Sequence, residues 1–237
     1  MFEKFSNSCN NSQERIKNFK MISDSFSRNK SKNLNELKEF TEEQRENLIE
    51  QLEKNIGIIK YKRTSSRNKK ICQVSNHLLG ETSEFIQVLL IEASGDGNCL
   101  FNSVSLLLYG NQGFSIELRM RAIFHMILNY ESYLDPSNYQ SVEFFNFVFS
   151  TTSDKTGETL EETFFNEVQR VPQIGEFTGL LIMVAVCNSL EISIKQIYPK
   201  VSGSKTQIEK FCNMSLSPFA KNIQRNNFIL SLEKNQS

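Results

Sequence analysis

The chain has few of the residues on which several classes of protein depend. Its 237 residues include no tryptophan and only two histidines, His77 and His125. The longest uninterrupted apolar run, Leu180–Cys187, is far too short to span a bilayer. The N-terminus contains no apolar core of a secretory signal. We therefore expect no membrane partner and an intracellular location, either cytoplasmic or nuclear.

The five cysteines do not fit a disulfide framework or a zinc site. Their number is odd, and no two of them form a Cys-x-x-Cys pair. Cys9, Cys72 and Cys212 do not cluster with the histidines in a metal-ligand spacing, and Cys187 lies in an apolar segment typical of a core. We expect free thiols in a reducing compartment, with no metal and no cofactor.

The net charge of zero, from 27 basic and 27 acidic residues, argues against bulk nucleic-acid binding. It conceals an asymmetry, because residues 1–70 carry a net charge of +6 and residues 71–237 carry −6. Six basic residues lie between Lys60 and Lys70. A solvated linker is one interpretation of this segment, and a nuclear-import or nucleic-acid patch is the other. Nucleic acid is expected as a partner only through residues 60–70.

The amino-acid composition changes along the chain, and this change predicts how the chain is divided. The first part is rich in Asn, Ser and Lys, which favours disorder or weak helix, and a better helix follows in which Thr41 and Gln44 fit a capping box. A packed domain begins where large apolar residues become frequent. The expected divisions are a disordered segment over 1–32, a helix over 33–58, a basic linker over 59–81, the packed domain over 82–232 and a tail over 233–237.

Helices and strands are mixed in the packed domain. The strands expected from apolar runs and alternation cover 85–91, 192–198 and 228–232. The helices expected from apolar periodicity cover 99–109, 138–149, 159–169 and 177–190. A further helix is expected to be capped by Ser115, and the residues on its inner face are Ile116, Met120, Ile123, Phe124 and Ile127. This pattern predicts an α+β or α/β/α layered domain.

The segment Ser94–Gly110 has the layout of a nucleophile at a strand–loop–helix junction. Gly95 and Gly97 permit a sharp turn and a close approach of the backbone to a ligand. Cys99 begins the helix, where the positive end of the dipole stabilises a thiolate. The backbone N–H groups of Asp96–Cys99 can hold a developing oxyanion. The alternative is a buried cysteine after an ordinary turn.

Six consecutive residues, Asp96–Phe101, closely resemble the nucleophile motif of the OTU (ovarian tumour) cysteine proteases, which are mostly deubiquitinases. The flanking pattern Ser115-x-Glu117-Leu118-Arg119, Gly175 and the strand ISIKQIYP resemble vertnin-type and mobile-element-associated OTU-like domains. The resemblance covers about residues 82–232. It implies an α/β (α+β), papain-like fold with a small central sheet flanked by helices, and ubiquitin or a ubiquitin-like modifier as the partner.

The resemblance also implies roles for individual residues. Cys99 would be the nucleophile, Asp96 would organise the loop, Gly97 and Asn98 would form the oxyanion hole, and Asn227 stands at the position of the catalytic histidine. An amide does not accept a proton at neutral pH, so Cys99 would lack its general base. Loss of such a group commonly costs about 10³–10⁶ in rate. The residue that would orient a histidine ring is also replaced, by Ile229.

Three functions follow. The first is an OTU-like domain that binds ubiquitin or a relative and cleaves it poorly or not at all, as a pseudoenzyme. The second is an active deubiquitinase with an unusual base, His77 or a water network, since His125 is expected at a surface or boundary position of its helix. The third is a non-enzymatic interaction module of mobile-element or host-factor type.

Overall fold

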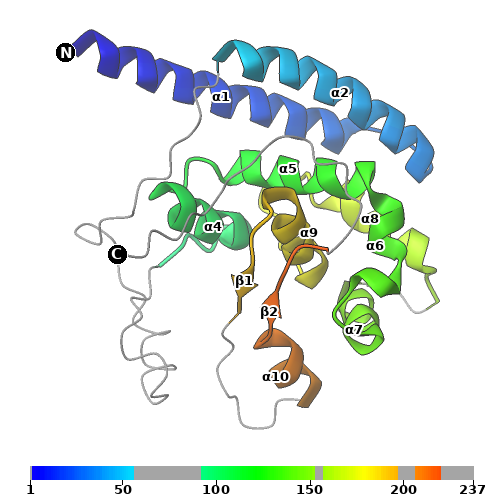
Figure 1. The fold of residues 1–237 in the computed structure, drawn as a ribbon. Helices are drawn as coiled ribbons and strands as arrows, with labels where there is room; N and C mark the ends of the chain where they lie inside the picture. Colours follow the sequence, from blue (N-terminus) through cyan, green and yellow to red (C-terminus); the bar gives the residue numbers. More distant parts are fainter. Residues whose placement is uncertain (1, 56–91, 153–156, 197–205, 220–237) are drawn as a thin grey trace, which may run out of the picture.

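The computed structural model describes residues 2–55, 92–152, 157–196 and 206–219 (Figure 1). The expected linker over 59–81, the tail over 233–237, the strands over 85–91 and 228–232, and the residues His77 and Asn227 lie outside these ranges. The helices are α1 (Phe2–Arg28), α2 (Leu34–Asn55), α4 (Cys99–Tyr109), α5 (Ser115–Leu128), α6 (Tyr130–Leu134), η3 (Pro136–Asn138), α7 (Val142–Thr152), α8 (Leu160–Arg170), α9 (Leu180–Leu190) and α10 (Thr206–Cys212). The strands are β1 (Ile194–Lys195) and β2 (Ser215–Leu216).

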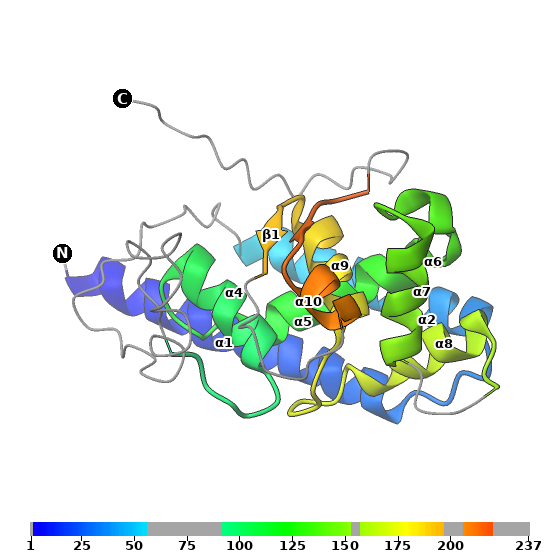
Figure 2. The ribbon, with the colours of Figure 1, turned by 90° about the horizontal axis from the view of Figure 1, so that it is seen from below.

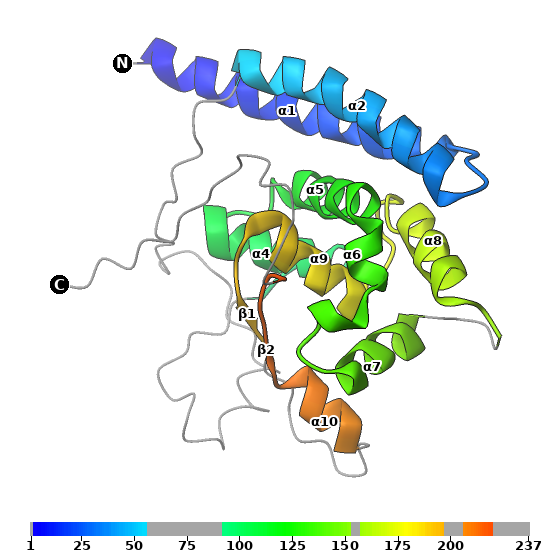
Figure 3. The ribbon, with the colours of Figure 1, turned by 45° about the vertical axis from the view of Figure 1, so that its right-hand side comes forward.

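Helix α5 lies at the centre of the described structure. It packs against α9 on one side and against α1 and α2 on the other (Figures 1 and 3). The inner face expected for this helix is confirmed, because Met120, Ile123 and Ile127 are fully buried. The helix begins at Ser115 itself, after Phe114, and no side chain caps it, so the expected Ser115 cap is wrong.

Residues 2–28 form a helix where disorder or weak helix was expected. Phe19, Ile22 and Phe26 are spaced to lie on one face of α1, and all three are buried in the core. Polar composition concealed this narrow apolar stripe, which tertiary packing against α5 and α8 stabilises. The N-terminal helices therefore belong to the same core as the packed domain.

The second helix starts earlier than its expected cap. Asn33 precedes α2, and its Oδ1 accepts a hydrogen bond from the N–H of Glu36, while the Glu36 carboxylate accepts one from the N–H of Lys32. Thr41 is buried inside the helix and its hydroxyl donates to the carbonyl of Leu37. The capping box assigned to Thr41 is therefore wrong, although the expected helix over 33–58 is present to Asn55.

Most of the described residues are helical, and the sheet among them consists of two antiparallel strands, β1 and β2. Ile194 pairs with Leu216 and Lys195 pairs with Ser215. The strand pair and α10 lie at the end of the molecule opposite α1 and α2 (Figures 1 and 2). The expected small central sheet is not present in these ranges and stays a prediction. No helix among the described residues combines the length and the apolar character needed to cross a membrane.

Candidate functional site

Cys99 is the first residue of α4 and is exposed. The helix runs to Tyr109, as expected, and ends at Gly110 in the left-handed conformation. The first N–H groups of any helix have no acceptor within it, and they carry the positive end of its dipole. The Cys99 thiol therefore lies at an electropositive helix start and is open to solvent.

Asp96 shapes the turn that leads to Cys99. Its Oδ1 accepts hydrogen bonds from the N–H of Asn98 and from Nδ2 of Asn102, both at 3.0 Å. Asn102 also donates to the carbonyl of Ser94. These bonds, first the one from the Asn98 backbone, hold the pKa of Asp96 below its usual value. Asp96 is thus an ionised acceptor at the centre of the turn.

Gly97 is required by a contact between two backbones. Its φ is +80°, and a Cβ placed on it would lie 1.6 Å from the carbonyl oxygen of Gly175, which itself has a φ of +96°. Only glycine tolerates both the conformation and the contact. The turn before Cys99, residues 94–98, therefore lies in direct contact with residues 171–177, in the loop between α8 and α9.

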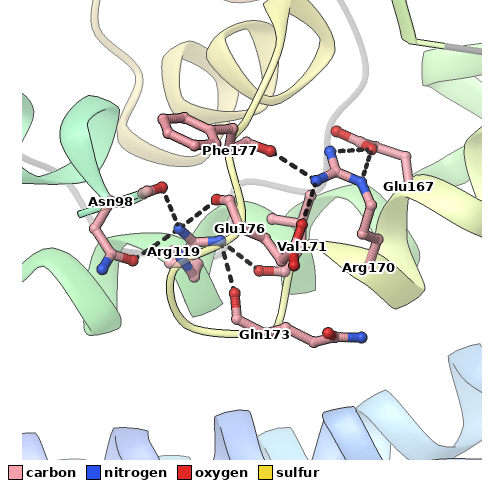
Figure 4. A network of polar contacts seen from close by, with 9 residues as sticks. Asn98, Arg119, Glu167, Arg170, Val171, Gln173, Glu176 and Phe177 are labelled. Carbon is pink, nitrogen blue, oxygen red and sulfur yellow. Dashed lines mark hydrogen bonds and ion pairs between the residues drawn. The ribbon is translucent and has the colours of Figure 1, made fainter. Parts of the chain in front are cut away.

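Arg119 holds these two segments together through hydrogen bonds to both (Figure 4). It projects from α5 and is fully buried. Its Nη1 donates to the carbonyls of Val171 (2.6 Å) and Gln173 (3.3 Å), and its Nη2 donates to the carbonyls of Gly97 (3.1 Å) and Glu176 (3.0 Å) and to Oδ1 of Asn98 (2.8 Å). Its guanidinium also lies 4.7 Å from the centre of the Phe101 ring. Burial, the largest effect, lowers the pKa of Arg119 to about 10, so it is a cation at neutral pH.

Sequence reasoning gave Arg119 no role beyond its place in a flanking pattern. A signal was available, because Arg119 follows Ile116 by three residues and precedes Ile123 by four, which places it on the apolar face of α5. A charged residue on such a face needs buried partners. Here those partners are carbonyl oxygens that only the tertiary structure brings together.

A second arginine holds the far end of the 171–177 loop. Arg170 pairs with the carboxylates of Glu167 at 2.7 Å and Glu176 at 3.1 Å. It also donates to the carbonyl of Phe177 at 2.7 Å (Figure 4). On the opposite flank, the hydroxyl of Ser23 in α1 donates to the carbonyl of Pro172. The loop is therefore fixed at its beginning, middle and end.

The hydrogen bonds of Asn98 affect which backbone N–H groups could form an oxyanion hole. The N–H of Asn98, one of the two expected donors, already donates to Asp96, and the Asn98 side chain turns toward Arg119. The N–H of Cys99 belongs to the first turn of α4, whose donors have no acceptor inside the helix. Cys99 is thus a better source of an oxyanion donor than Asn98.

His125 does not join Cys99 and Asp96. It lies six residues beyond Arg119, about 9 Å further along α5. Its Nδ1 is 2.7 Å from the hydroxyl of Tyr133, and burial lowers its pKa to about 4. It is a partly buried structural residue.

Within the described ranges, no group of three or more His, Cys, Asp or Glu side chains is arranged to hold a metal ion. Cys187 is fully buried in α9, as expected, and burial raises its pKa to about 11. Burial also raises the pKa of Cys212. Among the cysteines whose exposure the structure describes, Cys99 is the exposed one.

Comparison with known proteins identifies the family of the chain. A family model described as "Vertnin, OTU domain" matches residues 91–231. Over 119 residues, 47% of this chain, the sequence is 31% identical to Vertnin of Mus musculus, 30% to that of Ailuropoda melanoleuca and 29% to that of Homo sapiens. The match covers 16–17% of those relatives, so the chain spans less than a fifth of their length. No solved structure matches the chain significantly. The family match includes the turn before Cys99, residues 171–177 and α9, and the chain therefore belongs to the Vertnin OTU-domain family.

Proposed function

We propose that this domain binds the C-terminal acyl end of ubiquitin or a related modifier at Cys99, and that it hydrolyses the bound bond slowly or not at all. One observation carries the proposal: an exposed cysteine begins α4 directly after a loop that Arg119 and Gly97 hold against residues 171–177. Such a fixed loop costs little entropy when a ligand binds. The fixed loop is therefore suited to bind a ligand whose carbonyl group lies beside the Cys99 thiol.

The chemistry of the site supports binding more strongly than turnover. The Cys99 thiolate would attack a carbonyl carbon, and an N–H at the start of α4 would stabilise the oxyanion. Completing the reaction requires a group that takes the thiol proton and returns it to the leaving amine. By resemblance Asn227 stands at that position, and His125 is committed to Tyr133. We expect a rate about 10³–10⁶ below that of an intact site.

The finer fold is part of the same proposal. In a papain-like arrangement, residues 85–91 and 228–232 would extend the β1–β2 pair into a small central sheet. The existing pairing of Ile194 with Leu216 supports this, because both side chains pack in or against the core and give the sheet one apolar face. Hydrogen exchange tests the idea: slow amide exchange in 85–91 and 228–232 is expected, and rapid exchange in both contradicts it.

The function is tested with the full chain and ubiquitin. Isothermal titration measures the affinity for monoubiquitin, and iodoacetamide alkylation measures whether bound ubiquitin protects Cys99. We expect binding, protection, and diubiquitin turnover that is very slow in the natural sequence and rises at least a hundredfold in Asn227→His. Cys187→Ser is the control, since that thiol is buried in α9.

Each outcome has a clear meaning. Turnover of diubiquitin at an ordinary enzymatic rate by the natural sequence refutes the pseudoenzyme and favours the unusual base. Absence of both binding and protection refutes the ubiquitin site altogether. In that case a fragment that carries residues 60–70 and binds nucleic acid in a salt-sensitive way supports the interaction-module alternative.

A further inference from the structure

One polar side chain, that of Ser23, is buried on the face of α1 that enters the core. A serine inside a helix commonly points to solvent or donates to the carbonyl four residues before it. Ser23 instead donates its hydroxyl to the carbonyl oxygen of Pro172, 149 residues further along the chain. This hydrogen bond connects α1 to the loop of residues 171–177. The buried apolar neighbours of Ser23 on α1 are Phe19, Ile22 and Phe26.

Three consecutive carbonyl oxygens at the start of this loop are held by two different helices. Arg119 of α5 donates to the carbonyls of Val171 and Gln173 (Figure 4). Ser23 of α1 donates to the carbonyl between them, that of Pro172. A proline has no N–H, so its carbonyl is the backbone group through which a hydrogen bond can hold it. The position of Pro172 therefore depends on α1.

Residues 171–177 in turn support the turn before Cys99. The backbones of Gly97 and Gly175 are in contact, and Arg119 donates to carbonyl oxygens on both sides of that contact. Contacts therefore run without a break from α1 through this loop to the start of α4. Closely packed groups transmit a displacement to one another, so a change at α1 should reach Cys99.

Helix α1 lies outside the part of the chain that matches the family. The match covers residues 91–231, whereas α1 ends at Arg28. The hydrogen bond to Pro172 is therefore supplied by a segment that the matched domain does not include, and the support of the candidate site depends in part on that segment.

We propose that Ser23 is a positioning residue for the candidate site, because it holds Pro172 and so fixes the turn that leads to Cys99. Helix α1 and the turn are then coupled. Weakening the docking of α1 loosens the turn, and disturbing the turn loosens α1 by the same free energy. This inference goes beyond the proposed function and does not depend on which ligand binds at Cys99. The alternative is a hydrogen bond that stabilises the whole fold equally.

The test follows backbone amides by NMR in the full chain. Ser23→Ala leaves the buried carbonyl of Pro172 without this donor. The amides of Asn98 and Glu176 report on the turn and on the loop, because each donates a hydrogen bond there. We expect both to exchange their hydrogens about tenfold faster, and the amide resonance of Cys99 to shift. Exchange in α9 should change less than about twofold.

Three further variants complete the test. Ser27→Ala is the matched control, because that hydroxyl lies one turn further along α1 and donates to the carbonyl of Ser23 rather than to the loop. It should leave the exchange rates and the resonances of the turn unchanged. Ser23→Thr keeps a hydroxyl and should return the rates to within about twofold of the natural sequence. Gln169→Ala removes a second hydrogen bond to the N-terminal segment, at the carbonyl of Ser31, and should speed the same amides about two- to threefold.

Reciprocity provides a measurement from the other end of the contacts. Gly97→Ala disturbs the turn where it touches Gly175, at a distance from α1. The coupling predicts that exchange in α1 around Ser23 becomes faster by a larger factor than exchange in α7. Equal factors in the two helices would contradict the coupling.

The outcomes decide between the two roles of Ser23. An equal increase at Asn98, Glu176 and α9 in Ser23→Ala shows general destabilisation, and no increase at Asn98 shows that the turn holds its position without α1. Either result refutes the inference, as does a failure of Ser23→Thr to restore the rates. If Ser23→Ala does not fold, unchanged exchange in Gln169→Ala refutes it instead. Binding of ubiquitin by the natural sequence is a separate measurement, so each proposal can fail alone.

Discussion

Replacing Arg119 with methionine is the sharpest test of how the turn before Cys99 is held in place. The side chain is fully buried and donates five hydrogen bonds, four of them to carbonyl oxygens of Gly97, Val171, Gln173 and Glu176. Methionine is also unbranched and only slightly smaller in volume, so it fills much of the space and the effect reports mainly the lost donors. The carbonyl oxygens of Gly97 and Val171 and the Asn98 amide oxygen, whose bonds to Arg119 are buried, would be left without this partner.

The expected cost follows from two opposed effects. A hydrogen bond from a charged donor contributes about 1.5–3 kcal/mol, and burying the guanidinium cancels several kcal/mol of the total. Removing one member of such a buried set typically costs about 3–5 kcal/mol. That is a large part of the roughly 5–15 kcal/mol that stabilises a folded domain. Arg119→Lys keeps the charge but not the fork of donors, and should cost about 1–3 kcal/mol.

Urea unfolding followed by circular dichroism at 222 nm measures both changes, since the chain has no tryptophan. Arg28→Met is the matched control, because that arginine is exposed on α1 and donates to its own helix at Asp24. We expect a change below about 0.5 kcal/mol there. A loss below about 1 kcal/mol for Arg119→Met would show that the two loops hold their positions without this residue, which refutes its role in fixing them.

Three further perturbations test separate features. Gly97→Ala should lower the free energy of unfolding by about 2–4 kcal/mol in the same assay. Gly157 has a φ of +94° but open space around it, so Gly157→Ala should cost only about 1–2 kcal/mol. Equal costs would mean that the contact between Gly97 and Gly175 is unimportant. Burial lowers the pKa of His125 from 6.5 to about 4, so between these pH values the unfolded chain binds a proton that the folded chain does not. The free energy of unfolding should therefore fall by up to about 3 kcal/mol as the pH drops from 6.5 to 4. His125→Gln should remove most of that dependence on pH. Iodoacetamide followed by peptide mass spectrometry should modify Cys99 at least a hundredfold faster than Cys187, and comparable rates would contradict the burial of α9.

The helices of the domain were readable from the sequence because their signals are local. Apolar spacing placed α4, α5, α8 and α9 to within a few residues, and Gly110 ended α4 where expected. Thr159 and Glu162 form a capping box at the start of α8. Helix α1 was expected only as disorder or weak helix, because its three core residues are diluted by polar neighbours, and contact with α5 and α8 stabilises it.

In the candidate site, too, local features were predicted from the sequence and long-range contacts were not. The place of Cys99 at a helix start, after a glycine turn, was predicted from a short stretch of sequence, because a turn and a helix start are encoded locally. The hydrogen bonds of Arg119 to residues 97, 98, 171, 173 and 176 join segments far apart in the chain, and no local pattern specifies them.

By itself, the sequence determined the family, the candidate nucleophile Cys99 and the absence of a histidine after residue 125, since each of these depends only on residue identity and order. Only the tertiary structure decided that the N-terminal helices share the core, that His125 faces Tyr133, and that a buried cation fixes the loop before Cys99. The physical reason is that burial and hydrogen-bond satisfaction are properties of groups brought together by packing, and a charge on an apolar helix face acquires its role only when distant carbonyl oxygens surround it.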